Sequence, residues 1–245
     1  MGAADRVAGV SSYDRYPPEV ERLPRLGGLL DPDVERLLAL KPDLVVVYGT
    51  QSTLTRQLER AGVPMFAYVH RGLPDVMETI RALGRRIGIE PQAAALADRL
   101  ERRLRDIRAR VSGSRRPRTL LVFGREAGSL RNVDASGGYG FLHDMLEIAG
   151  ADDVLADVKR ESVRMSTEMI LTRAPEVIVE LHYGSSLKPE RLGAERAVWR
   201  ALSSLPAVKN DRVYLLTGDE FVVPGPRVAD ATERLARTLH PDAYK

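Results

Sequence analysis

Residues 91–111 form the stretch that most constrains the fold of this chain. Its apolar side chains recur at steps of four, four, three and four, at Leu96, Leu100, Leu104, Ile107 and Val111. That spacing predicts one apolar stripe on an α-helix. Pro91 suits a first helical turn, and Ser112-Gly113 ends the run. At 1.5 Å per residue, the helix spans roughly 30 Å.

Strand and helix patterns alternate on both sides of this helix, so it either connects two α/β lobes or is a crossover helix within one continuous sheet. The first side predicts strands at 7–10, 44–47 and 65–68, the second of them buried on both faces of a parallel sheet. One helix is expected to begin after Asp31, which can cap it, with Pro32 in the first helical position. A second helix is expected from Ser52 to Gly62. This β-α-β-α-β order indicates right-handed crossovers.

The second side repeats the same logic after the long helix. Strands are expected at 119–123, 177–181 and 213–216, with a weak short one at 154–155. Residues 124–140 read as a long glycine-rich loop. Helices are expected at 141–149, at 166–172 with Ser166 as cap, at 197–202 and at 227–239.

Composition excludes few functions. The formal net charge is +3, and there is no cysteine for disulfides or thiolate chemistry. The arginines of the long helix are interpreted as a solvated face, because no nucleic-acid-binding module or interleaved aromatics accompany them. The four histidines, at 70, 143, 182 and 240, lack metal-ligand spacing. His143 and Asp144 fall in a predicted helix and need no special role.

Candidate binding residues follow the predicted strands, because open α/β sheets bind ligands at the carboxyl ends of their strands. Phosphate-loop and serine-hydrolase motifs are missing. The first side contributes polar and aromatic residues, namely Ser11, Ser12, Tyr13, Tyr48 and Gly49. The second contributes Gly124, Arg125, Glu126, His182, Tyr183, Gly218, Asp219, Glu220 and Phe221. Tyrosines, glycines and a few charges make a plausible lining for a bulky ligand.

Several motifs together resemble the helical-backbone substrate-binding proteins of ABC importers, which serve cobalamin, siderophores and haem. The first side carries VSSY at 10–13, YPP at 16–18, LGG at 26–28 and VERLLALKPDLV at 34–45. The second carries FLxxMLExxG at 141–150, SxE at 166–168 and WxxLxxLPAVKNxRVY at 199–214. The likeness covers nearly the whole chain, and the members that bind cobalamin are the most similar.

The resemblance implies a class III periplasmic-binding-protein fold: two Rossmann-like lobes with parallel sheets, joined by one long helix. Residues 1–90 would form the N-terminal lobe, 91–112 the backbone helix and 113–245 the C-terminal lobe. Family members begin with a further strand and helix, which the first lobe here would lack, and no export signal is visible. The family location is periplasmic or extracytoplasmic, lipid-anchored or soluble.

The implied function is capture, without chemistry, of cobalamin or a related corrinoid in a cleft between the lobes. Stacking is expected from Tyr13, Tyr48, Tyr139 and Phe221, with Ser12, Gly49, Arg125, His182 and Asp219 as further ligand contacts. No metal site or resident cofactor is expected. The tryptophans of the cobalamin-binding cleft correspond here to Leu29, Tyr48 and Ser162, and the only tryptophan, Trp199, lies elsewhere. A ferric siderophore or haem is therefore the alternative ligand.

The resemblance also implies a partner, a membrane permease that docks transiently. Glu35 and Glu168 each lie near the start of a helix before a Pro-acidic-strand unit, and family members use glutamates there to meet permease arginines. Favourable interaction with the helix dipole is the plain structural alternative. A monomer is expected, and nucleic acid is not expected as a partner.

Two further functions remain open from the residues alone. One is an enzyme on the same bilobal frame, with His182, Glu180 or Asp219 as acid or base. The other is a cytoplasmic scaffold without a transport role, suggested by the missing export signal.

Overall fold

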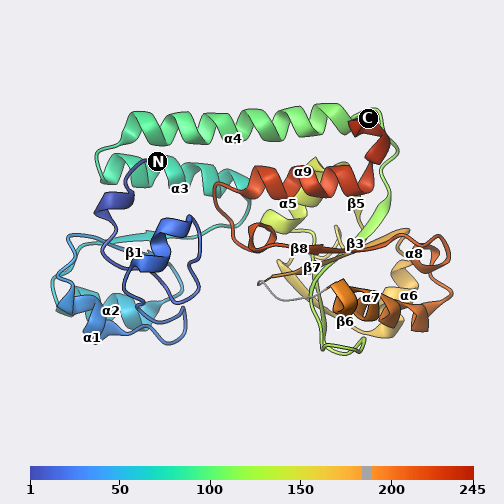
Figure 1. The fold of residues 1–245 in the computed structure, drawn as a ribbon, viewed down its shortest axis with the longest axis horizontal. Coiled ribbons are helices and arrows are strands. Elements are labelled where there is room, and N and C mark those ends of the chain that lie inside the picture. The colour runs from blue at the N-terminus through green and yellow to red at the C-terminus, as the bar shows by residue number, and fades with distance from the viewer. Residues whose placement is uncertain (184–188) are drawn as a thin grey trace. The chain divides into compact units, whose positions relative to one another are not determined.

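The computed structural model describes residues 1–183 and 189–245 (Figure 1). The chain divides into two compact units, Met1–Val69 with Glu78–Leu96, and His70–Met77 with Ala97–Lys245. These boundaries differ from the expected segments 1–90, 91–112 and 113–245. Both α3 (Leu73–Arg86) and α4 (Glu90–Val111) are shared between the two units. Each unit is described by itself below.

Helix α4 confirms the long helix that the apolar spacing predicts. All five residues of its stripe are buried, with at most 7% of each exposed. In the first unit, α3 and α4 approach closely, since a Cβ on Gly84 would lie 2.1 Å from the Cβ of Ala93. Glycine at this position is therefore a packing requirement, not a flexible point.

The first unit contains a β-α-β arrangement. Strands β1 (Val45–Tyr48) and β2 (Met65–Tyr68) pair in parallel, and α2 (Ser52–Arg60) connects them. Helix α1 (Val34–Ala39) precedes β1. Val47, Leu37, Leu54 and Leu58 form the buried core, so α1 and α2 pack on one face of this sheet.

Three expectations for the first unit need correction. Residues 7–10 form no strand, because only Val10 pairs, through an isolated bridge to Arg25. Val46 is 47% exposed, so β1 is not buried on both faces.

The third correction concerns the start of α1. Asp33, not Asp31, caps this helix by accepting a hydrogen bond from the backbone N–H of Arg36 at 2.9 Å. Asp31 Oδ1 instead accepts from the backbone N–H of Gly28, and Pro32 forms a bridge with Gly27. Residues 27–32 therefore form a turn before α1 and are not part of the helix.

The second unit contains a mixed sheet with strand order β6-β4-β3-β7-β8. The bounds are β3 (Arg118–Gly124), β4 (Val133–Ser136), β5 (Asp152–Asp153), β6 (Ser162–Met165), β7 (Val177–His182) and β8 (Val213–Thr217). Strands β3, β7 and β8 are parallel, and β5 pairs in parallel with β3. Strands β4 and β6 are antiparallel additions.

The antiparallel pair corrects the expected glycine-rich loop at 124–140. Residues 133–136 form β4, with Val133 and Ala135 fully buried. The VDAS sequence is too short and polar to be recognised as a strand, and only pairing with β3 and β6 fixes it. Ser162, which follows a turn, begins the other strand that the sequence pattern missed.

Helices surround the second-unit sheet (Figure 1). They are α5 (Phe141–Ile148), α6 (Thr167–Arg173), α7 (Pro189–Val198), α8 (Pro206–Lys209) and α9 (Val228–Leu239). Ser166 caps α6 as expected, accepting from the backbone N–H of Met169. Helix α9 lies beside the second half of α4, where Arg103 forms ion pairs with Asp230 and Glu233.

Short 3₁₀ helices complete the described chain, at Ala4–Arg6, Pro18–Arg22, Trp199–Leu202, Asp219–Phe221 and Pro241–Tyr244. The large core of the second unit contains the fully buried residues Leu120, Ile178 and Trp199. None of the described helices is both long enough and apolar enough to cross a bilayer.

Candidate functional site

The first unit exposes Tyr13 on a loop that the backbone holds in place. The Ser12 N–H donates to the carbonyl of Gly27 at 2.8 Å, and Arg25 donates to the carbonyl of Ser11. Tyr13 is 78% exposed, and its ring lies over Gly28, where an added Cβ would meet it at 2.9 Å. Gly28 thus lets the ring approach the backbone closely while most of its surface meets solvent.

Tyr48 and Gly49 follow β1, as the strand-end argument predicts. Gln51 connects this point to a second loop, because its Oε1 accepts from Tyr48 N at 3.1 Å and its Nε2 donates to the carbonyl of Leu29 at 3.0 Å. The rings of Tyr48 and Tyr68 meet edge to face with centroids 5.4 Å apart. Burial, with smaller contributions from Asp14 and Tyr48, raises the pKa of Tyr68, so its phenol is neutral.

Two exposed leucines adjoin these tyrosines and were not predicted as a pair. Leu29 is 49% exposed and Leu30 is 94% exposed. Gln51 and Gly28 link the leucine turn to Tyr48 and Tyr13. We name Tyr13, Leu29, Leu30 and Tyr48 the apolar strand-end surface of the first unit. A signal was present in the sequence, namely two leucines after a Gly-Gly turn.

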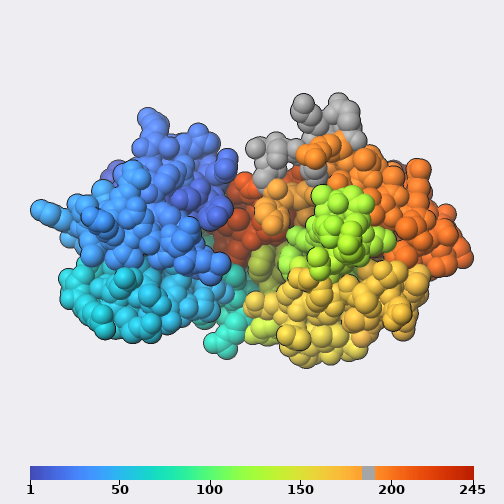
Figure 2. Space-filling view, turned by 90° about the horizontal axis from the view of Figure 1, so that it is seen from below, coloured from blue at the N-terminus to red at the C-terminus, as the bar shows by residue number. Residues whose placement is uncertain are grey.

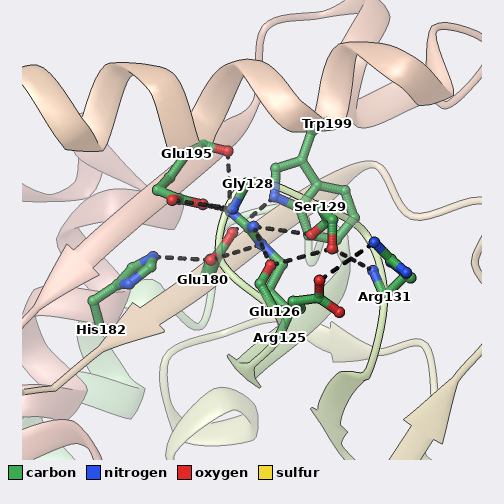
Figure 3. A network of polar contacts seen from close by, with 9 residues as sticks. All are labelled: Arg125, Glu126, Gly128, Ser129, Arg131, Glu180, His182, Glu195 and Trp199. Atoms are coloured by element: carbon green, nitrogen blue, oxygen red, sulfur yellow. Dashed lines mark hydrogen bonds and ion pairs between the residues drawn. The ribbon is translucent and has the colours of Figure 1, made fainter.

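The second unit places Arg125 differently from the expectation of a ligand contact. Only 2% of its side chain is exposed, and its Nη2 lies 2.8 Å from Glu195 Oε2. Its guanidinium also donates to the carbonyls of Ser129 and Glu195 at 3.0 Å (Figure 3). Arg125 therefore already binds groups of its own chain, and a ligand contact by it stays a prediction.

Glu180 joins Arg125 to the end of β7. Its Oε1 lies 2.9 Å from both Arg125 Nε and His182 Nε2, while its Oε2 accepts from Trp199 Nε1 at 2.8 Å (Figure 3). Both nitrogens lie close to the shared oxygen, although neither makes an aligned hydrogen bond to it. Trp199, the only tryptophan, thus has a structural role in the buried network.

Opposing effects act on the pKa of Glu180. Burial favours the neutral acid, but the close contact with His182, the hydrogen bond from Trp199 and the Arg125 charge outweigh it, so the pKa of Glu180 is lowered. We name Arg125, Glu180, Glu195 and Trp199 the buried ion network. His182, with 21% of its side chain exposed, lies at its solvent side.

The network fixes the loop that follows β3. Glu195 accepts from the backbone N–H of Gly128 at 3.1 Å, and Glu126 pairs with Arg131 at 3.4 Å. In Figure 2 this loop, in light green, lies on the surface between the orange and yellow segments of the second unit. The arrangement can hold this loop rigid, because the Glu180 and Glu195 carboxylates are both held by Arg125.

Phe221 corrects the expectation of an exposed stacking ring. Its side chain is completely buried, and the Arg234 guanidinium lies 4.8 Å from its ring centroid. Asp219 is half-buried beside it in the same 3₁₀ turn. The sequence could not predict which of the two side chains is buried, because a three-residue 3₁₀ helix is too short to show a periodic apolar face.

Tyr139 lies at a pocket of about 320 Å³ within the second unit. The loop before α3 and the start of α5 form its walls, with Arg71, Gly72, Pro74, Asp75, Gly138, Tyr139, Gly140, His143 and Asp144 as lining. Tyr139 is 40% exposed. His143 and Asp144, for which no special role was expected from the sequence, are therefore at a concave surface.

His143 is paired with a carboxylate behind the pocket. Its Nδ1 lies 2.8 Å from Asp153 Oδ2, and the Asp153 side chain is fully buried. The hydrogen bond that His143 donates to Asp153 raises the pKa of His143 against an opposing effect of burial, with further support from the Asp153, Glu147 and Asp144 charges. With Nδ1 occupied, Nε2 is the ring nitrogen left for another partner.

Glu35 and Glu168 are exposed in the first turns of α1 and α6. Both therefore lie near the start of a helix, as the sequence predicts, and their role in docking stays a prediction. Within residues 1–183 and 189–245, no three or more histidine, aspartate or glutamate side chains cluster in a way that could hold a metal ion.

Known proteins share both the sequence pattern and the fold of this chain. A family model described as "Periplasmic binding protein" matches residues 1–220. The chain is 28% identical over 250 residues to the uncharacterized ABC transporter substrate-binding lipoprotein YvrC of Bacillus subtilis, covering 100% of this chain and 76% of that one.

Two further proteins are similar over most of the chain. The vitamin B12-binding protein of Yersinia pestis (strain Pestoides F) is 25% identical over 240 residues, covering 97% of this chain and 80% of that protein. The structure of the periplasmic heme-binding protein BhuT with two hemes is 25% identical, with a TM-score of 0.77, covering 98% of this chain and 90% of that one. The class III binding-protein fold predicted from the sequence is thereby confirmed, and the chain belongs to the periplasmic binding protein family of ABC importers.

Proposed function

We propose that this protein captures cobalamin or a related corrinoid and delivers it to a membrane permease. Membership of the family supports a small-molecule ligand and a permease partner, together with an extracytoplasmic location. Similarity to a vitamin B12-binding protein supports the corrinoid. The apolar strand-end surface of the first unit is the observation that carries the proposal.

That surface suits a large, flat ligand. Tyr13 and Leu30 expose 78% and 94% of themselves, which is unusual for residues whose burial is favourable. A corrin or porphyrin ring offers an extended face on which an aromatic ring and two leucines can pack. Ser12, Gly49 and Tyr48 lie at the same loops and add polar and close backbone contacts.

In the second unit, Tyr139, His182 and Asp219 are the proposed contacts that retain exposed surface. The buried ion network would hold the loop beside His182 in a fixed position, which reduces the ordering cost of binding. Arg125 and Phe221 act within the chain in this proposal, not on the ligand.

Calorimetry tests the ligand directly. Cyanocobalamin, ferric haem and a ferric hydroxamate siderophore should be titrated into wild-type protein under one buffer condition. The proposal expects cyanocobalamin to bind most tightly. Tight binding of haem or the siderophore without binding of cyanocobalamin would contradict it.

Haem is the second candidate ligand, favoured by the similarity to a heme-binding protein at the same level of identity. It would use the same apolar surface. The two candidates differ in charge at the edge of the ring, because haem carries two propionates whereas the corrin edge carries neutral amides.

Glu35 and Glu168 are proposed as contacts to the permease, each on the first turn of an exposed helix. Such a carboxylate also favours the helix dipole, worth about 0.3–1 kcal/mol. Exposed charges at an interface should alter association rate and its salt dependence. Transient docking by a monomer is part of this proposal.

The double variant Glu35→Ala/Glu168→Ala separates the two roles. Permease-dependent uptake should fall while ligand affinity stays at the wild-type value and the melting temperature changes little. Glu19→Ala/Glu21→Ala, which removes two exposed carboxylates from another short helix of the first unit, is the control. Unchanged uptake in the first variant would rule out the docking role.

A further inference from the structure

The pocket between the loop before α3 and the start of α5 lies entirely within the second unit. Its volume of about 320 Å³ is at the lower end of small-molecule sites, so it admits a side group of a large ligand rather than the whole ligand. Two glycines of its lining have no room for a side chain, and Gly72 is the one that adjoins another lining residue. An added Cβ on Gly72 would meet Asp144 Oδ2 at 2.6 Å, and one on Gly138 would meet the Ala156 carbonyl oxygen at 2.2 Å.

One hydrogen-bond donor at this pocket is firmly oriented. Asp153 is buried, accepts from the backbone N–H of Leu155 at 2.8 Å and holds His143 Nδ1. The imidazole ring can therefore present only Nε2 to an occupant. The side-chain hydrogen bond to Asp153 raises the pKa of His143, so below that pKa the ring is protonated and Nε2 is a donor; Tyr139 also lines the pocket.

The charges around His143 are predominantly negative. Asp75 and Asp144 line the pocket, and Asp153 lies behind the ring, against Arg71 as the only cation of the lining besides His143. Glu161 lies beside Gly140, and Glu147 on α5 is paired with Arg116. When His143 is protonated, the three aspartates carry three negative charges, and Arg71 and His143 carry two positive ones. The pocket then has one excess negative charge, and Glu161 adds another.

The aspartates are held in place by the backbone. Asp144 Oδ2 accepts from the Leu73 N–H at 2.7 Å, and Asp75 Oδ2 accepts from the Arg71 N–H at 3.0 Å. They cannot turn away from an occupant without losing these hydrogen bonds. A carboxylate entering the pocket would meet a fixed negative field, whereas an uncharged carbonyl would meet the His143 donor without that repulsion.

We propose that this pocket is a subsite for an uncharged hydrogen-bonding group of the ligand, of the carboxamide class, and that its fixed aspartates select against a carboxylate at the same place. The subsite rests on the proposed function, because it assumes a ligand with polar groups at its edge. It makes Asp75 and Asp144 specificity-determining residues and His143 the donor. It also distinguishes the two candidate ligands, since corrinoids carry amides where haem carries propionates.

The first test compares cyanocobalamin with its monocarboxylic acids, in each of which one peripheral amide is hydrolysed. Titration of wild-type protein at pH 6, below the raised pKa of His143, should show one acid that binds about tenfold more weakly than the parent, the scale of a single unfavourable charge contact. Asp75→Asn/Asp144→Asn keeps an oxygen for each backbone N–H and removes both charges. In this variant the affinity ratio of parent to that acid should fall to about threefold or less.

The second test addresses the donor. His143→Leu should weaken binding of cyanocobalamin by about tenfold, and His143→Gln, which keeps a donor, should recover most of that loss. Asp157→Asn, an exposed aspartate paired with Arg173 away from the pocket, is the control, and its affinity ratio should match the wild type. A merely structural role for His143 would give equal losses in both variants.

The outcomes separate the subsite from the proposed function. If cyanocobalamin binds but every monocarboxylate binds equally well, the subsite is wrong and the corrinoid function stands. If haem binds instead, the corrinoid proposal fails, and the comparison of haem with its dimethyl ester decides the subsite. Tighter binding of the ester supports the uncharged-group assignment, equal or tighter binding of haem overturns it, and failure of all these compounds to bind overturns both.

Discussion

The two units expose different chemistry on the loops beside their parallel strands. In the first, Tyr13 and Leu30 are open to solvent on short loops held by backbone hydrogen bonds. In the second, the residues after β3 and β7 are drawn into the buried ion network, and Phe221 is completely buried. Loops beside the sheets of two α/β units can therefore serve different roles, with exposed apolar residues in one unit and buried ion pairs in the other.

Sheet size gives the physical reason for the difference. The first-unit sheet has two strands and a small core around Val47 and Leu58, so residues at its strand ends have little structure to pack against. The larger second-unit sheet brings β7 under α7, where Glu180 meets Arg125 and Trp199. A side chain there finds partners within the chain before it can meet a ligand.

The largest expected effect tests the network of the second unit. Arg125→Met removes the cation between Glu180 and Glu195 and leaves two buried carboxylates uncompensated, which should cost about 3–5 kcal/mol of unfolding free energy. Urea denaturation measures it. Arg164→Met, which breaks an exposed pair with Asp134, is the control and should cost about 1 kcal/mol or less. Equal losses would mean that burial of the network contributes nothing.

A smaller effect is expected at the helix contact of the first unit. Gly84→Ala would place a methyl group 2.1 Å from Ala93 Cβ, so α3 and α4 must separate, at a cost of about 1–3 kcal/mol. The control is Gly193→Ala, where nothing lies within 4 Å of the new Cβ and the helix should gain about 1 kcal/mol. Thermal melting of both variants should show shifts of opposite sign. A stabilised Gly84→Ala would show that the close approach is not a constraint.

The apolar surface should affect binding and not stability. Tyr13→Ala should lower the affinity for cyanocobalamin by at least about 1 kcal/mol, the scale of one good aromatic contact, while the melting temperature stays unchanged because the ring is 78% exposed. Calorimetry and melting of the same preparation give both values. Tyr183→Ala removes another exposed tyrosine and is the comparison in the second unit. A loss of stability without a loss of affinity would reverse the contrast between the units.

The smallest effect is a pH dependence at His143. Its pKa is raised from the ordinary 6.5, so the ion pair with Asp153 contributes stability that is fully present below pH 6.5. That contribution is lost as the pH rises through the folded-state pKa. His143→Gln should therefore destabilise the protein more at pH 5.5 than at pH 8.5, as measured by urea denaturation. A destabilisation that grows with pH would contradict the assigned charge state.

The sequence by itself determined the elements with strong periodicity. The stripe from Leu96 to Val111 predicts α4 to within one residue, because five apolar side chains at helical spacing have no alternative way to be buried together. The runs around Val47 and Val179 predict parallel strands, and Ser166 predicts the start of α6. Tyr48 could likewise be placed at a strand end, because strand direction follows from chain order, whereas Tyr13 follows residues that form no strand.

Only the tertiary structure decided which of these strand-end residues face solvent. Nothing in the local sequence distinguishes Phe221, which is buried, from Tyr13, which is exposed; the difference arises from what packs around each. Strand β4 exists because β3 and β6 pair with it, and Arg125 is buried because Glu180 and Glu195 converge on it from β7 and α7. His143 gained its partner in the same way, since Asp153 lies ten residues further along the chain and only the fold brings its carboxylate to 2.8 Å from the ring. Contacts between distant residues depend on packing in three dimensions, and periodicity along the chain does not encode them.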